Sequence, residues 1–285
     1  MGEKDRNLKN KIDNSVVMGE DVVIGENVVI MAGCIIGNHV TILDGAYLDF
    51  HVIVRDCVVV GKHAYIGSNC ILGEYTADFF TSRENKAAFL IIGENAVVRS
   101  GSILYSGTKT GNNFQTGHHV TIRENTLLGN HVSVGTLSDI QGNCEIGDYV
   151  RMHSNVHVGQ QSKIENFVWI FPYVVLTNDP TPPSENLEGV TIKEFAVIAT
   201  GSILLPGIVI ESDSLVAAGA VVTKDVHRGE VVGGNPAKVI SEISRIKNHI
   251  TGKEVYPWRY TFRRGMPWED SDYQTWCEGS GKAEE

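Results

Sequence analysis

The sequence predicts an all-β fold in which short parallel strands stack coil upon coil into a β-helix, and three periodic features predict it. Aliphatic residues or Met recur at every sixth position from Met18 to Leu72, from Ile92 to Leu176 and from Ile192 to Val222, at 29 of 31 positions. The residue two before each of them is usually small or Val, and Gly follows at 13 of the 31. A helix has no such period, whereas a strand places positions n and n−2 on one face. We therefore expect strands stacked around one continuous core, with the glycines allowing the chain to turn between them.

Two interruptions and a change of pattern divide the chain. The repeat predicts a β-helix over residues 16–230, preceded by a polar segment at residues 1–15. Insertions interrupt it at about residues 74–89 and 177–189. Because loops on a rigid scaffold often carry function, both insertions are candidates for contact with a ligand. Residues 231–285 form a carboxyl-terminal segment.

The carboxyl-terminal segment predicts a cap and an aromatic tail. Asn235 and Pro236 suit the cap and the first turn of a helix, and four isoleucines then follow at helical spacing, namely Ile240, Ile243, Ile246 and Ile250. We expect a short amphipathic helix that closes the end of the prism. The segment Tyr256 to Trp276 holds three of the four tryptophans. We expect this tail to pack against a neighbouring subunit or the prism wall rather than to contact a nucleotide.

Charge and composition exclude several classes of protein. The chain has 24 Lys and Arg against 34 Asp and Glu, a net charge of −10, which argues against broad binding to nucleic acid or to an anionic membrane. Six acidic residues and one lysine place −5 of this charge in Glu269–Glu285, so a nearly balanced prism can still hold anionic ligands. No apolar run approaches the roughly 18 residues that span a bilayer, and the amino terminus has no hydrophobic signal core. Five cysteines without a CxxC pair fit a reducing compartment, so we expect a cytoplasmic protein.

One histidine stands out against the repeat. His119 shares its slot, three residues after a repeat aliphatic, with other histidines and asparagines that suit a tight corner. It lies close to Thr110 and Thr116, the two polar residues of the aliphatic series, and local departures from a packing rule often mark function. Asn155 follows 36 residues later, so both side chains should project from one corner about 10 Å apart. Leu137 fills the slot between them.

The repeat resembles that of hexapeptide-repeat acyltransferases, and Gly233-Gly-Asn-Pro-Ala-Lys238 resembles the segment that closes many of them. The resemblance implies a left-handed parallel β-helix of about ten coils, three hexapeptides to each. The segments around His119 and Asn155 are similar to those of nucleotide-sugar N-acyltransferases, in particular dTDP-3-amino-3,6-dideoxyhexose N-acetyltransferases. Such an enzyme would transfer an acyl group, here acetyl, from acyl-CoA to the amine of a dTDP- or UDP-linked amino-deoxy sugar for a surface glycan. It would be a homotrimer with its sites between subunits and no metal.

The resemblance also implies roles for individual residues. His119 would accept the proton of the amine or only position the sugar, and Asn155 would orient His119 or the amine. Coenzyme A would lie against small residues of the last coils, with cations near its phosphates: Ala199, Gly201, Ala217, Gly219, Lys224, Pro236 and Lys238. The sugar nucleotide would contact Arg99, Arg123, Glu124 and Asn125, because arginine suits a pyrophosphate and a carboxylate suits a sugar hydroxyl or amine. Solvated charges on a prism face are the alternative for this last group.

Two other functions stay open at this point. His118, His153 and His157 resemble the three-histidine zinc site of β-helical carbonic anhydrases, although the spacing fits loosely. A scaffold without enzymatic activity would also use this fold, but it leaves the insertions and the two inward threonines unexplained. The sequence does not decide between dTDP and UDP, between an amine at C2, C3 or C4, or between acyl chains.

Overall fold

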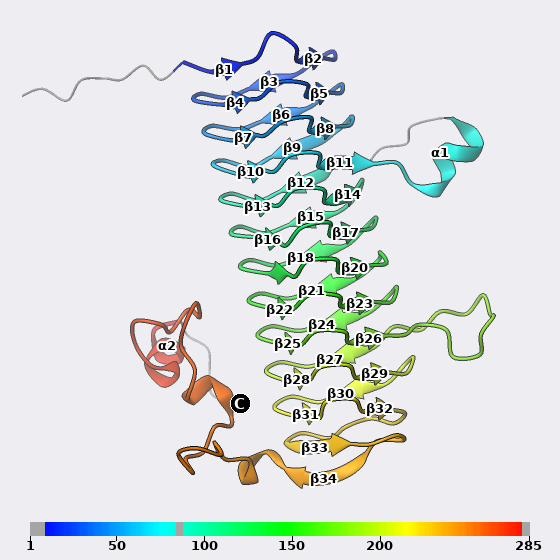
Figure 1. The fold of residues 1–285 in the computed structure, drawn as a ribbon, viewed down its shortest axis with the longest axis vertical. Helices are drawn as coiled ribbons and strands as arrows, with labels where there is room; N and C mark the ends of the chain where they lie inside the picture. Colours follow the sequence, from blue (N-terminus) through cyan, green and yellow to red (C-terminus); the bar gives the residue numbers. More distant parts are fainter. Residues whose placement is uncertain (1–8, 84–87, 281–285) are drawn as a thin grey trace, which may run out of the picture.

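The computed structural model describes residues 9–83 and 88–280, which form a three-sided prism with a tail along one side (Figure 1). Three sheets make the sides, and we call their outer surfaces face A, face B and face C. The chain passes from sheet A to sheet B at edge AB, from B to C at edge BC, and from C back to A at edge CA. This is the predicted left-handed parallel β-helix, and its sheets of 13, 11 and 10 strands make about 12 turns, slightly more than the ten coils expected.

The strands are short and follow the six-residue period. Sheet A comprises β1 (Lys11–Ile12), β4 (Val29–Ile30), β7 (Tyr47–Leu48), β10 (Tyr65–Ile66), β13 (Val97–Val98), β16 (Gln115–Thr116), β19 (Ser133–Val134), β22 (Arg151–Met152), β25 (Trp169–Ile170), β28 (Val197–Ile198), β31 (Leu215–Val216), β33 (Glu230–Gly233) and β34 (Lys238–Glu242). Sheet B comprises β2 (Val17–Met18), β5 (Ile35–Ile36), β8 (Ile53–Val54), β11 (Ile71–Glu74), β14 (Ile103–Tyr105), β17 (Thr121–Ile122), β20 (Asp139–Ile140), β23 (His157–Val158), β26 (Val175–Leu176), β29 (Ile203–Leu204) and β32 (Val221–Val222). Sheet C comprises β3 (Val23–Ile24), β6 (Thr41–Ile42), β9 (Val58–Val60), β12 (Leu90–Ile92), β15 (Lys109–Thr110), β18 (Leu127–Leu128), β21 (Glu145–Ile146), β24 (Lys163–Ile164), β27 (Thr191–Ile192) and β30 (Val209–Ile210).

The repeat aliphatics build the core of the prism. Ile30, Ile66 and Leu104 are at most 1% exposed and stack within one continuous cluster. Strands pair with the same side of the next coil, as Val17 does with Ile35. Burial of each such side chain contributes about 1.5–3 kcal/mol relative to leaving it in water. The stacking begins at β1, earlier than the expected residue 16, because Lys11 and Ile12 pair with β4. Both side chains are exposed, so this strand lacks the buried residue by which the repeat is recognised in the sequence.

The corners correct the expected role of the glycines. Among the described glycines that follow a repeat aliphatic, Gly73 alone has a left-handed φ (78°), so the others do not themselves adopt the turn. A Cβ at Gly93 would lie 2.1 Å from the carbonyl oxygen of Gly111, so glycine is needed there because adjacent coils approach closely. The left-handed φ falls two residues later, at positions such as Asn95 (φ 55°) and His63 (φ 56°). Short polar side chains tolerate that conformation best.

Both insertions leave the prism at edge BC, on the same side of the molecule (Figure 1). The first follows β11 and contains helix α1 (Ala77–Ser82); residues 84–87 lie outside the described residues. Tyr75 stacks on Phe79 at 3.8 Å between ring centroids, and the Arg55 guanidinium lies 4.3 Å from the Tyr75 ring. The second insertion follows β26 and rejoins the prism before β27.

The predicted helix after Pro236 is wrong. Residues Lys238–Glu242 form β34, antiparallel to β33, and only the one-turn helix η1 (Ile243–Arg245) follows. Ile240 is 62% and Ile250 81% exposed, so the isoleucines do not form a buried helical face. The open edge of β33 offers unpaired backbone groups, and pairing with them outweighs the local helical spacing.

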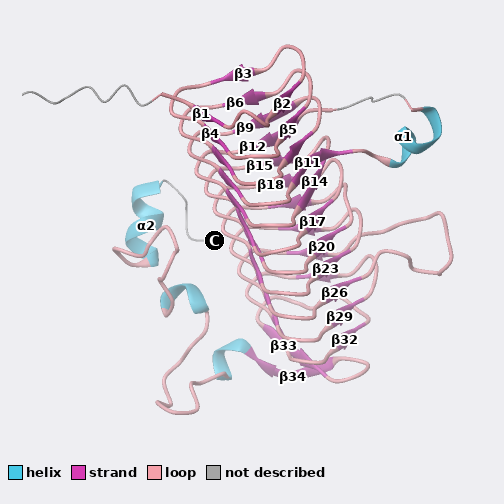
Figure 2. Cartoon of the chain, turned by 45° about the horizontal axis from the view of Figure 1, so that its top comes forward, coloured by secondary structure: helices cyan, strands magenta, loops and turns pink. Residues whose placement is uncertain are grey.

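The aromatic tail packs on the wall of its own prism, which is one of the two positions expected, the other being a neighbouring subunit. It contains η2 (Trp258–Tyr260) and the terminal helix α2 (Tyr273–Ser280), and lies beside face A (Figure 2). Trp268 is fully buried and lies 5.2 Å from the ring of Phe167, a residue of edge CA. Arg259 forms a buried ion pair with Asp213. Within the described ranges, no helix has the length and apolar character needed to cross a bilayer.

Candidate functional site

The predicted pair His119 and Asn155 does lie on one edge. The backbone N–H groups of His119, Leu137 and Asn155 donate in turn to the preceding coil along edge AB, at 2.9 to 3.1 Å. Leu137 separates the pair and is 57% exposed. A Cβ on Gly101 would lie 2.3 Å from Nδ1 of His119, so the imidazole sits directly over that glycine. His51 over Gly33 and His63 over Gly45 repeat this arrangement. The role of His119 stays a prediction.

The two inward threonines have a structural explanation. The Gly93 N–H donates to Oγ1 of Thr110 at 3.1 Å, and the Arg99 N–H donates to Oγ1 of Thr116 at 2.8 Å. Both threonines are at most 6% exposed. Their hydroxyls therefore satisfy backbone donors of the preceding coil. These threonines no longer single out His119.

The residues predicted to hold coenzyme A form two groups. Gly201 and Gly219 lie on edge AB, and a Cβ at either would meet nothing within 4 Å. Ala199 and Ala217 come two residues before them. The second group consists of Lys224, Pro236 and Lys238, which line a cavity of about 360 Å³ at the carboxyl-terminal end of the prism. Edge AB at Gly201 and Gly219 and the cavity at Lys224 both adjoin sheet B, because the last strand of that sheet, β32, ends two residues before Lys224.

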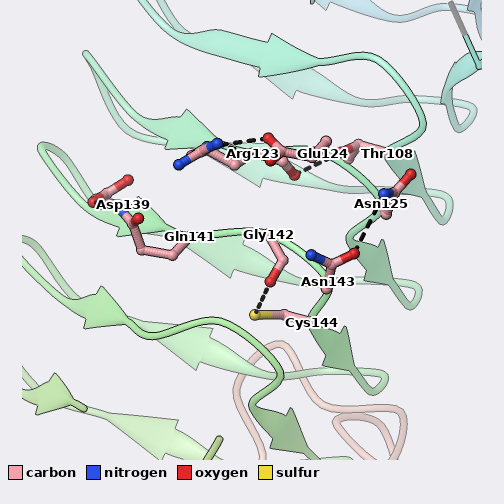
Figure 3. A network of polar contacts seen from close by, with 9 residues as sticks. All are labelled: Thr108, Arg123, Glu124, Asn125, Asp139, Gln141, Gly142, Asn143 and Cys144. Carbon is pink, nitrogen blue, oxygen red and sulfur yellow. Dashed lines mark hydrogen bonds and ion pairs between the residues drawn. The ribbon is translucent and has the colours of Figure 1, made fainter. Parts of the chain in front are cut away.

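The four predicted sugar-nucleotide residues are not brought together within one chain. Arg123 pairs with Glu124 through Nη2 at 2.8 Å and Nε at 3.0 Å, and Nδ2 of Asn125 donates to Asn143 at 3.3 Å (Figure 3). These three follow β17 at edge BC. Arg99 follows β13 at edge AB and lines a cavity on face A.

A polar window on face B was missed by the sequence reasoning. Eight of the eleven outward positions of sheet B are Val or Ile, but three consecutive coils carry Thr121, Asp139 and His157. Nδ1 of His157 lies 3.3 Å from Oδ2 of Asp139, which also accepts a hydrogen bond from Gln141. Burial opposes ionisation of Asp139, but the contacts with His157 and Gln141 outweigh it and lower its pKa. Alignment of the sequence at 18-residue spacing would have revealed this window.

This window can accept a proton. A carboxylate facing Nδ1 favours the tautomer with hydrogen on Nδ1, which leaves Nε2 of His157 as an acceptor. Arg123 adds a favourable charge near Asp139, and its guanidinium lies 5.7 Å from the Tyr105 ring. The window lies in coils between the two insertions, with edge AB on one side and Arg123 and Glu124 on the other.

The three histidines of the zinc alternative do not form one cluster in the chain. His118 and His153 line the cavity on face A, whereas His157 contacts Asp139 on face B. Across residues 9–83 and 88–280, no group of three or more His, Cys, Asp or Glu side chains could hold a metal ion.

Comparisons with known proteins agree with the repeat. Residues 15–49 match the family described as bacterial transferase hexapeptide (six repeats). The chain is 37% identical over 101 residues to 2,3,4,5-tetrahydropyridine-2,6-dicarboxylate N-acetyltransferase of Staphylococcus aureus strain JH9, a match that covers 35% of this chain and 36% of the relative. The chain thus spans about a third of the length of the curated relatives it matches.

Similar solved structures share low sequence identity. UDP-N-acetylglucosamine O-acyltransferase from Moraxella catarrhalis RH4 aligns with a TM-score of 0.47 and 19% identity over 95% of this chain and 93% of that one. PerB from Caulobacter crescentus, in complex with CoA and GDP-perosamine, aligns with a TM-score of 0.21 and 17% identity over 82% and 58%. The six-residue repeat that runs through the whole prism agrees with the match of residues 15–49 to the bacterial transferase hexapeptide family.

Proposed function

We propose that the protein transfers an acyl group, acetyl in the first instance, from acyl-CoA to the amine of a dTDP- or UDP-linked amino-deoxy sugar. The polar window Thr121, Asp139 and His157 carries this proposal. It puts a proton acceptor on an otherwise apolar face. On one side of it lies edge AB, where acyl-CoA is predicted to bind, and on the other side lies the Arg123–Glu124 pair. The N-acetyltransferase activity in the name of the Staphylococcus aureus relative supports the reaction class.

The reaction needs little more than position and one base. The sugar amine attacks the thioester carbonyl, a C–N bond forms, and the C–S bond breaks. Nε2 of His157 takes the proton from the amine and returns it to the departing thiolate of coenzyme A. Asp139 stays ionised and holds the imidazole in place. His119 and Asn155, on the neighbouring edge, are proposed to position the sugar, with Glu124 and Asn125 as hydrogen-bond partners for its hydroxyls.

The donor is proposed to lie along edge AB. The open corners of Gly201 and Gly219 admit a thin pantetheine arm beside Ala199 and Ala217. Three coils, roughly 14 Å, separate Gly219 from Asn155 on this edge. Lys224, Lys238 and Pro236 at the end of the prism are the proposed contacts for the phosphates and the adenosine.

A homotrimer would complete these sites. The outward residues Val17, Ile35 and Ile203 of face B are 60%, 48% and 37% exposed. Such an apolar face suits coverage by a neighbouring subunit, which would also exclude water from the window. In that arrangement, Arg99 and Arg123 of different chains could contact one ligand.

The direct test is release of free thiol from acetyl-CoA with a panel of dTDP- and UDP-amino sugars that differ at C2, C3 and C4. We expect saturable turnover with at least one member, and mass spectrometry should show an N-acetyl product. A complete absence of turnover with acetyl-CoA and longer acyl-CoA donors, in protein that folds and binds ligand, contradicts the proposal.

Gly219→Asn tests whether acyl-CoA binds along edge AB. Asn occupies many of the left-handed corners of this prism, so the backbone should accept it while its side chain fills the open space. We expect the KM for acetyl-CoA to rise about tenfold with little change in the KM for the sugar nucleotide. Thermal unfolding should stay near that of the wild type. An unchanged KM for acetyl-CoA would place the donor elsewhere.

A further inference from the structure

A second cavity lies between face A and the aromatic tail. Its volume is about 510 Å³, within the roughly 300–1,000 Å³ of small-molecule sites. Five successive coils supply its wall, from the coil of β13 to that of β25, and Arg264 of the tail lies among its lining residues. The window on face B lies on the other side of edge AB.

The charge of this cavity differs from that of the chain. Its lining contains three arginines, Arg99, Arg151 and Arg264, with His118 and His153, and no carboxylate. The other cavities described on the prism each contain at least two carboxylates, and the chain as a whole carries −10. A concave surface lined by one sign of charge attracts the opposite ion. The cavity therefore selects an anionic ligand.

Trp169, one of the residues that line the cavity, has a hydrogen-bond donor without an acceptor. Nε1 of Trp169 is buried and has no partner among the described residues. A buried N–H that lacks an acceptor costs free energy. His153 stacks on Phe171 at 4.7 Å, and burial together with the nearby Arg151 lowers its pKa. The lowered pKa favours the neutral imidazole of His153, so the arginines supply the positive charge of the cavity.

The tail is held at this cavity by a specific contact. Nη2 of Arg151 donates to the carbonyl oxygens of Arg264 and Gly265 at 3.1 and 2.9 Å, while the guanidinium lies 4.9 Å from the Trp169 ring. Gly265 has φ 69°, and a Cβ there would lie 2.3 Å from Nη2 of Arg151. A glycine is thus required for the contact that places Arg264 at the cavity.

We propose that this cavity binds the diphosphate group of a nucleoside diphosphate, with Arg99 from the prism and Arg264 from the tail as its phosphate contacts. Guanidinium groups bind phosphate oxygens through paired hydrogen bonds, and two of them suit two adjacent phosphates. The volume leaves room for the nucleoside beside the diphosphate. The ligand is either a free nucleotide or the nucleotide part of the proposed acceptor, and only the second source rests on the proposed function.

Isothermal titration calorimetry on the full chain tests the site with dTDP, UDP, ADP and inorganic pyrophosphate as probes. We expect at least one nucleoside diphosphate to bind, and Arg264→Ala and Arg99→Ala each to weaken it about tenfold. Gly265→Ala should weaken it as well, although it removes no charge. Arg245→Ala is the matched control: it removes an arginine that is paired with Glu242 and 72% exposed, and it should bind like the wild type.

The outcomes separate the site from the reaction. If no nucleoside diphosphate binds, or if Arg99→Ala and Arg264→Ala bind as tightly as the wild type while their thermal unfolding is normal, the proposal is overturned. If binding weakens and the KM for the sugar nucleotide rises by a similar factor, the cavity holds the acceptor. If binding weakens and that KM is unchanged, the cavity holds a separate nucleotide. Absence of acyl transfer would leave the binding result intact.

Discussion

Replacement of His157 by Gln is expected to lower kcat for acyl transfer by about 10²- to 10⁴-fold, with little change in either KM. The Gln side chain can still donate to Asp139, but it cannot take a proton from the sugar amine. Stopped-flow or steady-state thiol release gives kcat and both KM values. Asp139→Asn should lower kcat less, because the His157 imidazole is still present and loses only the carboxylate that orients it.

The pH profile distinguishes a base from a structural residue. In His157→Gln the residual rate should climb with pH as the substrate amine loses its proton unaided, whereas the wild type should change less over the same range. Asp139, Arg123, Glu124 and Tyr105 surround this position and remain in the variant, so the difference reports on the imidazole.

The chain offers a matched control for this experiment. Nδ1 of His39 lies 3.2 Å from Oδ2 of Asp21, a similar contact in the first coils of the prism. His39→Gln should therefore leave kcat and both KM values unchanged. If His157→Gln keeps a near-normal kcat while His119→Asn loses it, the proton acceptor is His119 and our assignment of the window is wrong.

Trp268→Ala is expected to destabilise the docked tail by about 3–5 kcal/mol, the usual loss for a fully buried tryptophan. The indole is 0% exposed, contacts Phe167 and Tyr273, and donates to the carbonyl of Phe262 at 3.0 Å. Because the tail cluster is separate from the core of the prism, the tail should open while the coils stay folded. Hydrogen exchange should show lost protection in residues 256–280 alone.

An exposed isoleucine of the same segment provides the comparison. Ile250 is 81% exposed, so Ile250→Ala should change stability by no more than about 0.5 kcal/mol. If the tail keeps its protection in Trp268→Ala, the aromatic cluster is not what holds it. Loss of the tail should also weaken nucleotide binding, since Arg264 would leave the cavity.

The glycines and the polar window show how far sequence periodicity reaches. The period of six predicted the strands and the core, because a stacked coil repeats one environment and every aliphatic residue meets its equivalents. It also suggested that Gly93 and its equivalents permit turns, whereas their Cβ positions are filled by the next coil. Asp139 and His157 were within reach of the sequence, since the same spacing of 18 brings them together.

The carboxyl-terminal segment shows where local pattern loses to tertiary contact. Ile240 and Ile250 suggested a helix, but the end of a parallel sheet leaves backbone groups of β33 without partners, and β34 satisfies them. Nothing in the local spacing of the isoleucines encodes that open edge.

By itself, the sequence determined the β-helix, because short-range periodicity specifies which side chains face inward in every coil. Tertiary structure alone decided that the chain after Pro236 pairs with β33 and that Arg264 of the tail joins a cavity on face A. The physical reason is that these relations depend on where a segment without the repeat docks, and the period that encodes the core carries no information about that.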